Sequence, residues 1–476
     1  MCWGESRKVK KSESKSKNTV RNELARPGQT VNERLSAGKA LRVKVPRTSH
    51  AKWAGASGRR DPIALLRASD RGKLPELLPI RYGRMCASPF AFYRGAAALM
   101  ARDLAGTPVT HLRVQTCGDC HVANFGGFGS PERRLVFDIN DFDETLPGPW
   151  EWDVKRLAAS IVLAGRQRGM KERHCGDAAR RAVESYRMHM REYAGMRAID
   201  VWYSHLGASL LIDKATSVAA KNRWREVEER ARMQTAEHLF PKMTAVVNGR
   251  RRFIDRPPLV YHPRETDKFE KDVRNIFYRY MLTLPEERRV ILDRYRVVDV
   301  VQKVVGVGSV GTQCAAALMM AGERDPLFLQ IKEAVPSALE AYAGKSRYKN
   351  HGERVVTGQR MLQATPDVFL GWTRDDHGRD YYVRQLRDMR MKVEIEEMSR
   401  GDWLEYVAVC AWTLARAHAR TGDAARIAGY MGKSGTFDQA IQGFAVAYAD
   451  QTERDYAALV KAVRAGKIKA ERNLKG

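Results

Sequence analysis

Two polar segments lie close together in this chain, and each directly follows a short apolar stretch. Residues 112–115 predict a strand that leads into residues 117–125 (CGDCHVANF). Residues 135–139 predict a second strand that leads into residues 140–144 (NDFDE). A helix is predicted from about residue 151 to residue 168. Acidic and amide side chains at the ends of two neighbouring strands favour one shared polar site.

The spacing of these polar residues is typical of phosphoryl transfer. Asp119 and Asn124 are five positions apart, so one turn of a loop can direct both side chains at a phosphate. Asp119 can orient and deprotonate a hydroxyl group, and Asn124 with Asp141 can bind magnesium, which prefers oxygen ligands. Asp138 and Asp143 compete with Asp141 for the metal. The candidate catalytic residues are Asp119, His121 and Asn124, and the candidate metal ligands are Asn124, Asp141 and Asp143. The alternative is structural, because Asp and Asn also favour turns and helix caps.

A glycine-rich stretch follows a β-branched run at residues 298–305, with glycines at 306, 308 and 311. Glycines at this spacing allow backbone N–H groups to approach phosphates. In one interpretation, residues 312–321 form a helix and Glu333 binds the ribose of a dinucleotide. A tight turn that binds no ligand is a second interpretation.

In a third interpretation, residues 312–321 form a return strand and Lys332 binds a nucleotide phosphate. Glu353, which lies 21 residues later in a predicted helix, would then orient Lys332, and Glu340 is the alternative partner. The candidate nucleotide-binding residues are Gly306, Gly308, Gly311, Lys332 and Glu353. The acidic loops elsewhere in the chain favour this third interpretation.

The stretch Gly118-Asp119-x-His121-x-x-Asn124 resembles the catalytic loop of aminoglycoside and choline phosphotransferases, which are relatives of protein kinases. Residues 139–142 resemble the kinase magnesium loop, with Asp143 where glycine is usual, and Asp153 resembles the Asp that braces the catalytic loop. Residues 414–423 (LARAHARTGD) resemble the helix that runs into that loop. Because the glycine motif follows the acidic loops here, the resemblance implies a circular permutation.

From about residue 61 onward the chain also resembles the bacterial family known as domain of unknown function 2252. The family name implies no activity. The segments that carry this resemblance are PIRYGRM (79–85), SPFAFYRGAA (88–97), CGDCHVANFG (117–126), LVFDINDFDETLPGPWEWDVKRLAAS (135–160), KVVGVGSVGT (303–312), DPLFLQIKEA (325–334) and YYVRQLRDMRMK (381–392).

The kinase-like interpretation predicts an α+β, two-lobed, circularly permuted fold with a mostly helical large lobe and a small antiparallel-sheet lobe. Residues 1–60 are predicted to be a disordered basic arm, since they hold 16 Lys and Arg against four Asp and Glu. Residues 61–295 are predicted to form the helical lobe with the catalytic and metal loops, and residues 296–395 the β-rich nucleotide-binding lobe. Residues 396–476 are predicted to add helices that complete the large lobe.

Charge and cysteine content narrow the classes of partner. The formal net charge of +27 favours anionic partners, and residues 1–60 are either a solubilising tail or a weak nucleic-acid contact. No apolar run approaches the roughly 18 residues of a membrane span, and seven cysteines fit a reducing cytoplasm. The Cys117-x-x-Cys120-His121 pattern matches haem-attachment and redox motifs, but we expect neither, because no export signal and no second pair of metal ligands accompany it.

The leading functional prediction is an ATP- and Mg²⁺-dependent phosphotransferase that acts on a hydroxyl group of an unidentified small molecule or protein. Adenylyl transfer would use the same parts. One alternative is a basic nucleic-acid-associated binding protein with an inactive kinase-like site. The other is an NAD(P)-dependent oxidoreductase.

Overall fold

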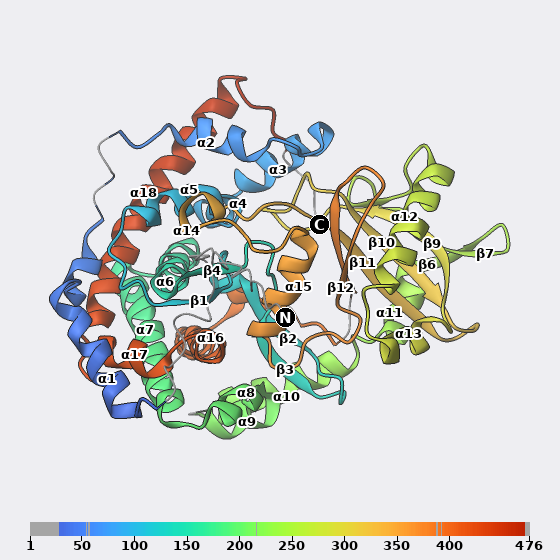
Figure 1. The fold of residues 1–476 in the computed structure, drawn as a ribbon. Coiled ribbons are helices and arrows are strands. Elements are labelled where there is room, and N and C mark those ends of the chain that lie inside the picture. The colour runs from blue at the N-terminus through green and yellow to red at the C-terminus, as the bar shows by residue number, and fades with distance from the viewer. Residues whose placement is uncertain are drawn as a thin grey trace, which may run out of the picture.

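The computed structural model describes residues 28–471, apart from 54, 56, 57, 216, 387, 388 and 392. The fold is α+β, as predicted, and has two parts that lie side by side in Figure 1. We call them the helical part, which comprises helices α1–α10 and α16–α18, and the sheet part, which comprises a six-stranded sheet with helices α11–α13. Among the described helices, none is both long and apolar enough to cross a membrane.

The centre of the helical part is made by four long helices. These are α6 (Trp150–Gln167), α7 (Glu172–Gly195), α16 (Arg400–Thr421) and α18 (Thr436–Arg464). Helix α6 is buried along almost its whole length, and Trp150 at its start stacks on Tyr186 of α7 with 5.8 Å between ring centroids. The other helices of this part are α1 (Val31–Ala40), α2 (Pro62–Ser69), α3 (Leu78–Met85), α4 (Pro89–Gly95), α5 (Ala97–Ala105), α8 (Ala198–Tyr203), α9 (Ala208–Lys214), α10 (Val218–Arg232) and α17 (Ala424–Met431).

Short strands on the helical part carry the polar loops. Strand β1 (Arg113–Thr116) pairs antiparallel with β4 (Leu146–Pro149). Strand β3 (Leu135–Ile139) lies between β2 (Phe125–Gly129) and β5 (Leu206–Gly207). Both strands predicted before the polar segments are therefore confirmed, and α6 confirms the helix predicted after them.

The sheet part is built on an antiparallel sheet with the order β12-β13-β11-β10-β9-β8. Its strands alternate their apolar side chains between two faces, so that Leu329 packs toward α12 and the neighbouring Phe328 packs toward α11. Both faces of the sheet are covered. The elements are α11 (Ala236–Met243), β6 (Thr244–Val247), β7 (Arg250–Phe253), β8 (Val260–Tyr261), α12 (Thr266–Met281), α13 (Glu286–Leu292), β9 (Arg296–Lys303), β10 (Cys314–Met320), β11 (Pro326–Ala334), β12 (Gly371–Arg374) and β13 (Asp380–Gln385).

Helix α15 (His351–Leu362) connects the two parts. It follows β11 and the short helix α14 (Glu340–Ala343), contacts β12, β13 and α16, and lies between the sheet and the helical bundle in Figure 1. Loops that project from both parts meet beside this helix, so its position brings the glycine-rich stretch near the acidic loops.

Two predicted boundaries need correction. Residues 1–27 of the predicted disordered arm lie outside the described residues, but α1 begins at Val31, where Thr30 and Glu33 form a capping box. Residues 236–295 were predicted to belong to the helical lobe and instead pack on the sheet, because the apolar faces of α11 and α12 cover its two sides.

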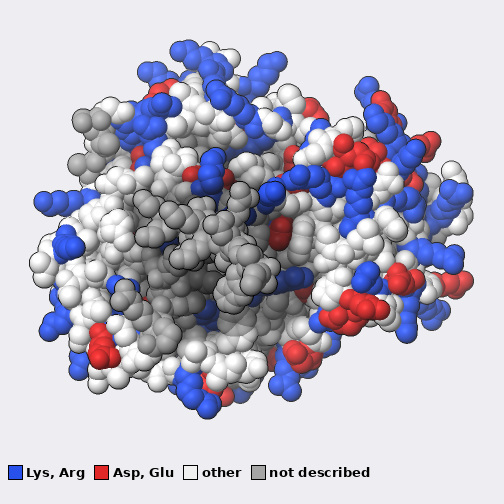
Figure 2. Space-filling model, in the orientation of Figure 1, with Lys and Arg blue, Asp and Glu red and all other residues white. Residues whose placement is uncertain are grey.

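Charged side chains are distributed unevenly over the face shown in Figure 2. Lys and Arg side chains surround the whole outline, whereas Asp and Glu side chains gather mainly on the right, over the sheet part. This pattern accords with the net charge of +27.

Candidate functional site

A cavity of about 1020 Å³ lies where the two parts meet. From the helical part it is lined by Asp119, His121, Asn124, Asp141 and Asp143. From the sheet part it is lined by Gly306, Gly308, Ser309 and Lys332. The fold thus brings together residues that lie more than 160 positions apart in the chain.

The loop that carries Asp119 is fixed by hydrogen bonds to the side chain of Asp153 in α6. The two carboxylate oxygens of Asp153 accept hydrogen bonds from the backbone N–H groups of Cys117 and Gly118, at 2.7 and 3.0 Å. His418 of α16 contacts the same carboxylate at 3.2 Å. Asp153 is buried, so these bonds are sheltered from water. The predicted bracing role of Asp153 agrees with this geometry.

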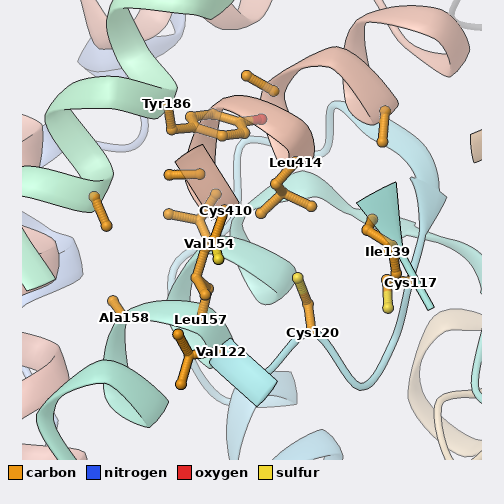
Figure 3. Close-up of a cluster of buried hydrophobic side chains, with 14 of the residues drawn as sticks. Cys117, Cys120, Val122, Ile139, Val154, Leu157, Ala158, Tyr186, Cys410 and Leu414 are labelled. Carbon is orange, nitrogen blue, oxygen red and sulfur yellow. The ribbon is translucent and has the colours of Figure 1, made fainter. Parts of the chain in front are cut away.

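The cysteines of the same loop anchor it in the hydrophobic core. Figure 3 shows Cys120 and Val122 among side chains of α6 and α16, while Cys117 lies beside Ile139. Both cysteines are free thiols and fully buried, and burial raises the pKa of Cys120 well above its usual value. No group of three or more His, Cys, Asp or Glu side chains arranged to hold a metal occurs in the described part of the chain. Both thiols thus contribute to the packing of the core around this loop.

Asp119 faces the cavity in an ion pair with Arg156 of α6. Two nitrogens of Arg156 approach Oδ1 of Asp119, with Nε at 2.6 Å. The guanidinium is buried, whereas the Asp119 side chain keeps 21% of its surface exposed. His121, two residues later, is buried beside Phe90, and burial together with Arg94 and Arg156 lowers the pKa of His121 well below its usual value. The site therefore presents the carboxylate of Asp119, paired with Arg156, next to an imidazole whose neutral form is favoured.

The second acidic loop follows β3 and meets Lys332 of β11. The ammonium group of Lys332 forms an ion pair with Oδ2 of Asp143 and lies 3.8 Å from Asp141. Asp143 also accepts hydrogen bonds from the hydroxyl groups of Ser309, at 2.9 Å, and Tyr382, at 2.7 Å. Asp143 is therefore fully engaged, while Asp141 turns 42% of its side-chain surface to the cavity.

The surroundings shift the pKa values of Lys332, Asp143 and Asp141 in different directions. Burial alone would lower the pKa of Lys332, but Asp141 and Asp143 outweigh it and raise that pKa. Burial alone would raise the pKa of Asp143, but Lys332 and the hydroxyl donors hold it below its usual value. The pKa of Asp141 is raised, first because the cavity walls reduce its hydration and then because Asp143 repels it. Of the two carboxylates, Asp141 is the one whose charge a bound cation would stabilise more.

The other candidate ligands divide between the cavity and the core. Asp138 is buried and accepts two hydrogen bonds of 2.7 Å from Arg416, so it serves the core and does not reach the cavity. Nδ2 of Asn124 contacts the backbone oxygens of Asp119 and Asp141, at 3.2 and 3.0 Å. Because Nδ2 is engaged by the protein, Oδ1 is the atom through which Asn124 can bind a cation. Asn124 and Asp141 thus supply the hard oxygen ligands that fit Mg²⁺.

The dinucleotide interpretation of the glycine-rich stretch is wrong. It required a helix over residues 312–321, but residues 314–320 form strand β10, which pairs antiparallel with β9 and β11. The stretch is therefore the connection of a β-hairpin. Residues 314–320 (CAAALMM) form a continuous apolar run that is buried on both faces of the sheet. Such a run has no periodicity that distinguishes a strand from a helix.

Lys332 and Glu353 are not brought together. Among the described residues, the ion pairs of Lys332 involve only Asp141 and Asp143. Glu353 lies in the first turn of α15, where its N–H group bonds the Asn350 cap, and the neighbouring Arg354 turns toward the acidic loop instead. Glu340, the alternative partner, contacts Lys345 and His351. The prediction of a Lys332–Glu353 pair is thus wrong, because Asp143 takes the place of the helix carboxylate.

Sequence reasoning missed Arg156, Arg354 and Tyr382. Arg156 follows Asp153 by three positions on a helix, so a signal for its placement on the same face existed. Tyr382 stands opposite Lys332 in the register of β11 and β13, which no local pattern specifies.

A model of one protein family matches residues 71–462 of this chain. The chain belongs to the bacterial family of uncharacterized proteins called domain of unknown function 2252. Comparison with curated proteins and with solved structures gives no match.

Two segments that identified this family from the sequence contact each other at the cavity. In this member of domain of unknown function 2252, Arg81 of α3 donates to the backbone oxygens of Val307 and Gly308, at 3.2 and 3.1 Å. Arg84 donates to the oxygen of Gly306. The N–H group of Leu74 bonds the oxygen of Gly311 at 2.7 Å. Residues 74–84 therefore hold the glycine hairpin against the cavity.

Proposed function

We propose that this protein is an ATP- and Mg²⁺-dependent phosphotransferase that acts on a hydroxyl acceptor, built on a circularly permuted kinase-like fold. The sheet part would bind the nucleotide, and the helical part would supply the base and the metal ligands.

The order of the elements supports the kinase-like layout. The glycine hairpin joins β9 and β10, Lys332 follows on β11, α15 comes next, and β12 and β13 complete the sheet. This is the arrangement expected of a kinase small lobe. Helix α16 then ends beside the start of the catalytic loop, where Thr421 accepts a hydrogen bond from Gln115, 306 positions earlier in the chain. In the order expected of a kinase, this helix would continue directly into the catalytic loop. A chain that is interrupted between them and joined elsewhere would have the permuted order seen here.

One observation carries the proposal. The glycine hairpin, the β11 lysine and the acidic loop meet at a single carboxylate, because Ser309 and Lys332 both bond Oδ2 of Asp143. Backbone from a glycine hairpin, a buried lysine and two carboxylates around one cavity form an arrangement that suits a polyphosphate with a divalent cation. On this proposal Lys332 would exchange Asp143 for a phosphate oxygen when the nucleotide binds.

The chain's own groups can account for the transfer. Bound Mg²⁺ would neutralise charge on the phosphates, held by Asp141 and Asn124. Arg156 holds Oδ1 of Asp119, which leaves Oδ2 to accept the proton of the acceptor hydroxyl. The acceptor oxygen would form a bond to the γ-phosphorus as the bond from that phosphorus to the bridging oxygen breaks. ADP would leave with that electron pair, and the proton would remain on Asp119.

Thermal unfolding with ligand titration tests the proposal. We expect MgATP to raise the unfolding midpoint with increasing concentration, and ATP with EDTA or NADP to raise it much less, because only a ligand of the native state stabilises it. Lys332→Ala should abolish the MgATP shift. If that variant does not fold, Asp141→Asn takes its place, since this side chain faces the cavity. Asp200→Asn, on α8 with 39% of its side chain exposed, is the matched control.

Asp119→Asn separates binding from chemistry. We expect it to keep the MgATP shift and to lower slow ATP hydrolysis by about 10²–10⁴-fold, the usual contribution of a general base. A folded wild-type protein without any MgATP shift would refute the proposal. A shift that Lys332→Ala and Asp141→Asn leave intact would place nucleotide binding elsewhere.

A further inference from the structure

A second cavity, of about 500 Å³, lies beside α15 and shares no lining residue with the first. Its walls come from the start of β1, the end of α16, α8 and the segment between α14 and α15. The lining residues are Arg113, Gln115, Leu146, Pro147, Trp202, Gly344, Lys345, Ser346, Arg347, Tyr348, Arg354, Met361, Arg420 and Thr421.

The lining of this second cavity has an unbalanced charge. Five of its residues are Lys or Arg, and none of the described lining residues is Asp or Glu. Acids outside the lining act on some of these cations. Glu340 is 3.9 Å from Lys345. Glu144 and Asp143 favour the charge of Arg354, and Asp138 favours that of Arg420. The lining nevertheless carries five positive charges around one hollow, and a bound anion would reduce the repulsion among them.

Arg354 provides a buried donor that the protein does not use. Its side chain is 1% exposed, and its terminal nitrogens donate to the backbone oxygens of Asp143, Thr145 and Val335. Its Nε atom is buried without a hydrogen-bond partner. A buried donor without a partner is costly in a folded protein, and Arg354 is one of the residues that line this cavity. Burial, as the largest cause, lowers the pKa of Arg354.

Arg420 and the aromatic side chains define the opposite side. The guanidinium of Arg420 lies over the ring of Trp202 at 3.9 Å and donates to the oxygen of Met361 at 2.9 Å. Burial, and then repulsion by Arg416, lowers the pKa of Arg420 to about 10. Arg347 lies over the ring of Tyr348 at 4.8 Å. Trp202 and Tyr348 thus position the guanidinium groups of Arg420 and Arg347 at the cavity, and an aromatic ring leaves the positive charge of a guanidinium in place.

We propose that this second cavity binds a small phosphorylated molecule through its phosphate group. Guanidinium groups match phosphate oxygens in geometry and in charge, and several of them together favour a doubly charged anion over a carboxylate. A volume of about 500 Å³ suits a metabolite of modest size and not a macromolecule. The inference does not depend on activity at the first cavity.

Titration with inorganic pyrophosphate in EDTA tests the site, because omission of Mg²⁺ disfavours binding at the acidic first cavity. We expect a saturable change in tryptophan fluorescence that chloride at the same ionic strength does not reproduce. Trp202→Phe should remove this change while calorimetry still detects binding. A fluorescence change that persists in Trp202→Phe would place the anion elsewhere and overturn the proposal.

A matched pair of double variants separates the site from general attraction to a basic protein. Lys345→Gln with Arg347→Gln removes two exposed cations of the cavity, and Arg173→Gln with Lys268→Gln removes two exposed cations elsewhere. We expect the first pair to weaken pyrophosphate binding by about tenfold or more, since hydrogen bonds to charged groups are strong. The second pair should leave it within about twofold, because neither residue lines the cavity and salt screens the attraction between distant exposed charges. Equal weakening by both pairs, or no saturable binding, would refute the proposal.

Discussion

The two walls of the first cavity are held in different ways. On the helical wall, buried polar side chains reach the backbone of the loops. Ser160 accepts from the N–H group of Val122 at 2.8 Å, and Gln363 donates to the oxygen of Ile139 at 2.7 Å. On the sheet wall, the glycine hairpin is held by segment 74–84, which comes from a distant part of the chain. The wall that carries the candidate base is therefore part of the core, whereas the glycine hairpin of the opposite wall is held mainly through its backbone oxygens.

This contrast suggests a division of work. A base and metal ligands need fixed positions, which buried hydrogen bonds provide. A hairpin that covers a nucleotide must admit and release it, so a hold through backbone oxygens is better suited to it. Changes to the helical wall should therefore cost folding stability, whereas changes to the hairpin should cost less and act more on ligand binding.

Asp153→Ala should have the largest effect. The substitution leaves the N–H groups of Cys117 and Gly118 buried without a partner and removes the carboxylate beside His418. Loss of one partner from a buried charged network costs about 3–5 kcal/mol, which urea unfolding would measure. Asp177→Ala is the control, since the ion pairs of that half-exposed residue are 3.9 Å long. A cost below about 1 kcal/mol, the usual worth of a surface ion pair, would contradict the contrast.

The secondary structure around the site was predictable because it depends on local patterns. The β-branched run at 298–305 became β9 (Arg296–Lys303), and the apolar residues 327–331 became the centre of β11 (Pro326–Ala334). The membership of residues 236–295 in the sheet part was not predictable, since helix periodicity does not reveal which partner a helix covers. The buried faces of α11 and α12 match two sides of one sheet only in three dimensions.

The candidate site was predictable by residue type but not by pairing. Asp119, Asn124, Asp141 and Lys332 were all identified, and all four line one cavity. Their partners were missed, because an ion pair such as Lys332–Asp143 joins residues 189 positions apart and leaves no spacing in the sequence. The expected Glu353 came from an analogy in which the acidic loop has glycine where this chain has Asp143.

A pair of glycine substitutions can measure how tightly the hairpin is held. Gly306 and Gly311 both have positive φ angles, of 67° and 101°, so alanine is strained at either position. A Cβ atom at Gly306 would make only ordinary van der Waals contacts with Ser309, at 3.7 Å or more, whereas one at Gly311 would lie 2.9 Å from Cβ of Lys73. We expect Gly306→Ala to cost about 1–2 kcal/mol of unfolding free energy and Gly311→Ala to cost more, since it also displaces segment 74–84. Equal costs in thermal or urea unfolding would show that the contact with that segment contributes little.

Lys73 links the same contact to pH, and its effect should be the smallest. Burial, and then repulsion by Arg81, lowers the pKa of Lys73 to about 8, although Asp70 opposes the shift. Lys73 lines the first cavity. Its positive charge favours anionic ligands below pH 8, so we expect the affinity for MgATP to fall as the pH rises through 8. The fall cannot exceed about tenfold per pH unit, the limit for one linked proton.

The folding stability of the free protein should respond to Lys73 with the opposite sign. Between pH 8 and the usual lysine pKa of 10.5, the unfolded chain holds the Lys73 proton while the native chain has released it. Unfolding then takes up a proton, so the contribution of Lys73 to stability rises with pH over this range. Lys73→Met should remove both trends, and calorimetry of MgATP binding and urea unfolding between pH 7 and 10 would detect them. Two outcomes would exclude Lys73 as the link between the hairpin contact and the cavity. One is that MgATP affinity and unfolding free energy change in the same direction with pH in the wild type. The other is that Lys73→Met shows the same pH profiles as the wild type.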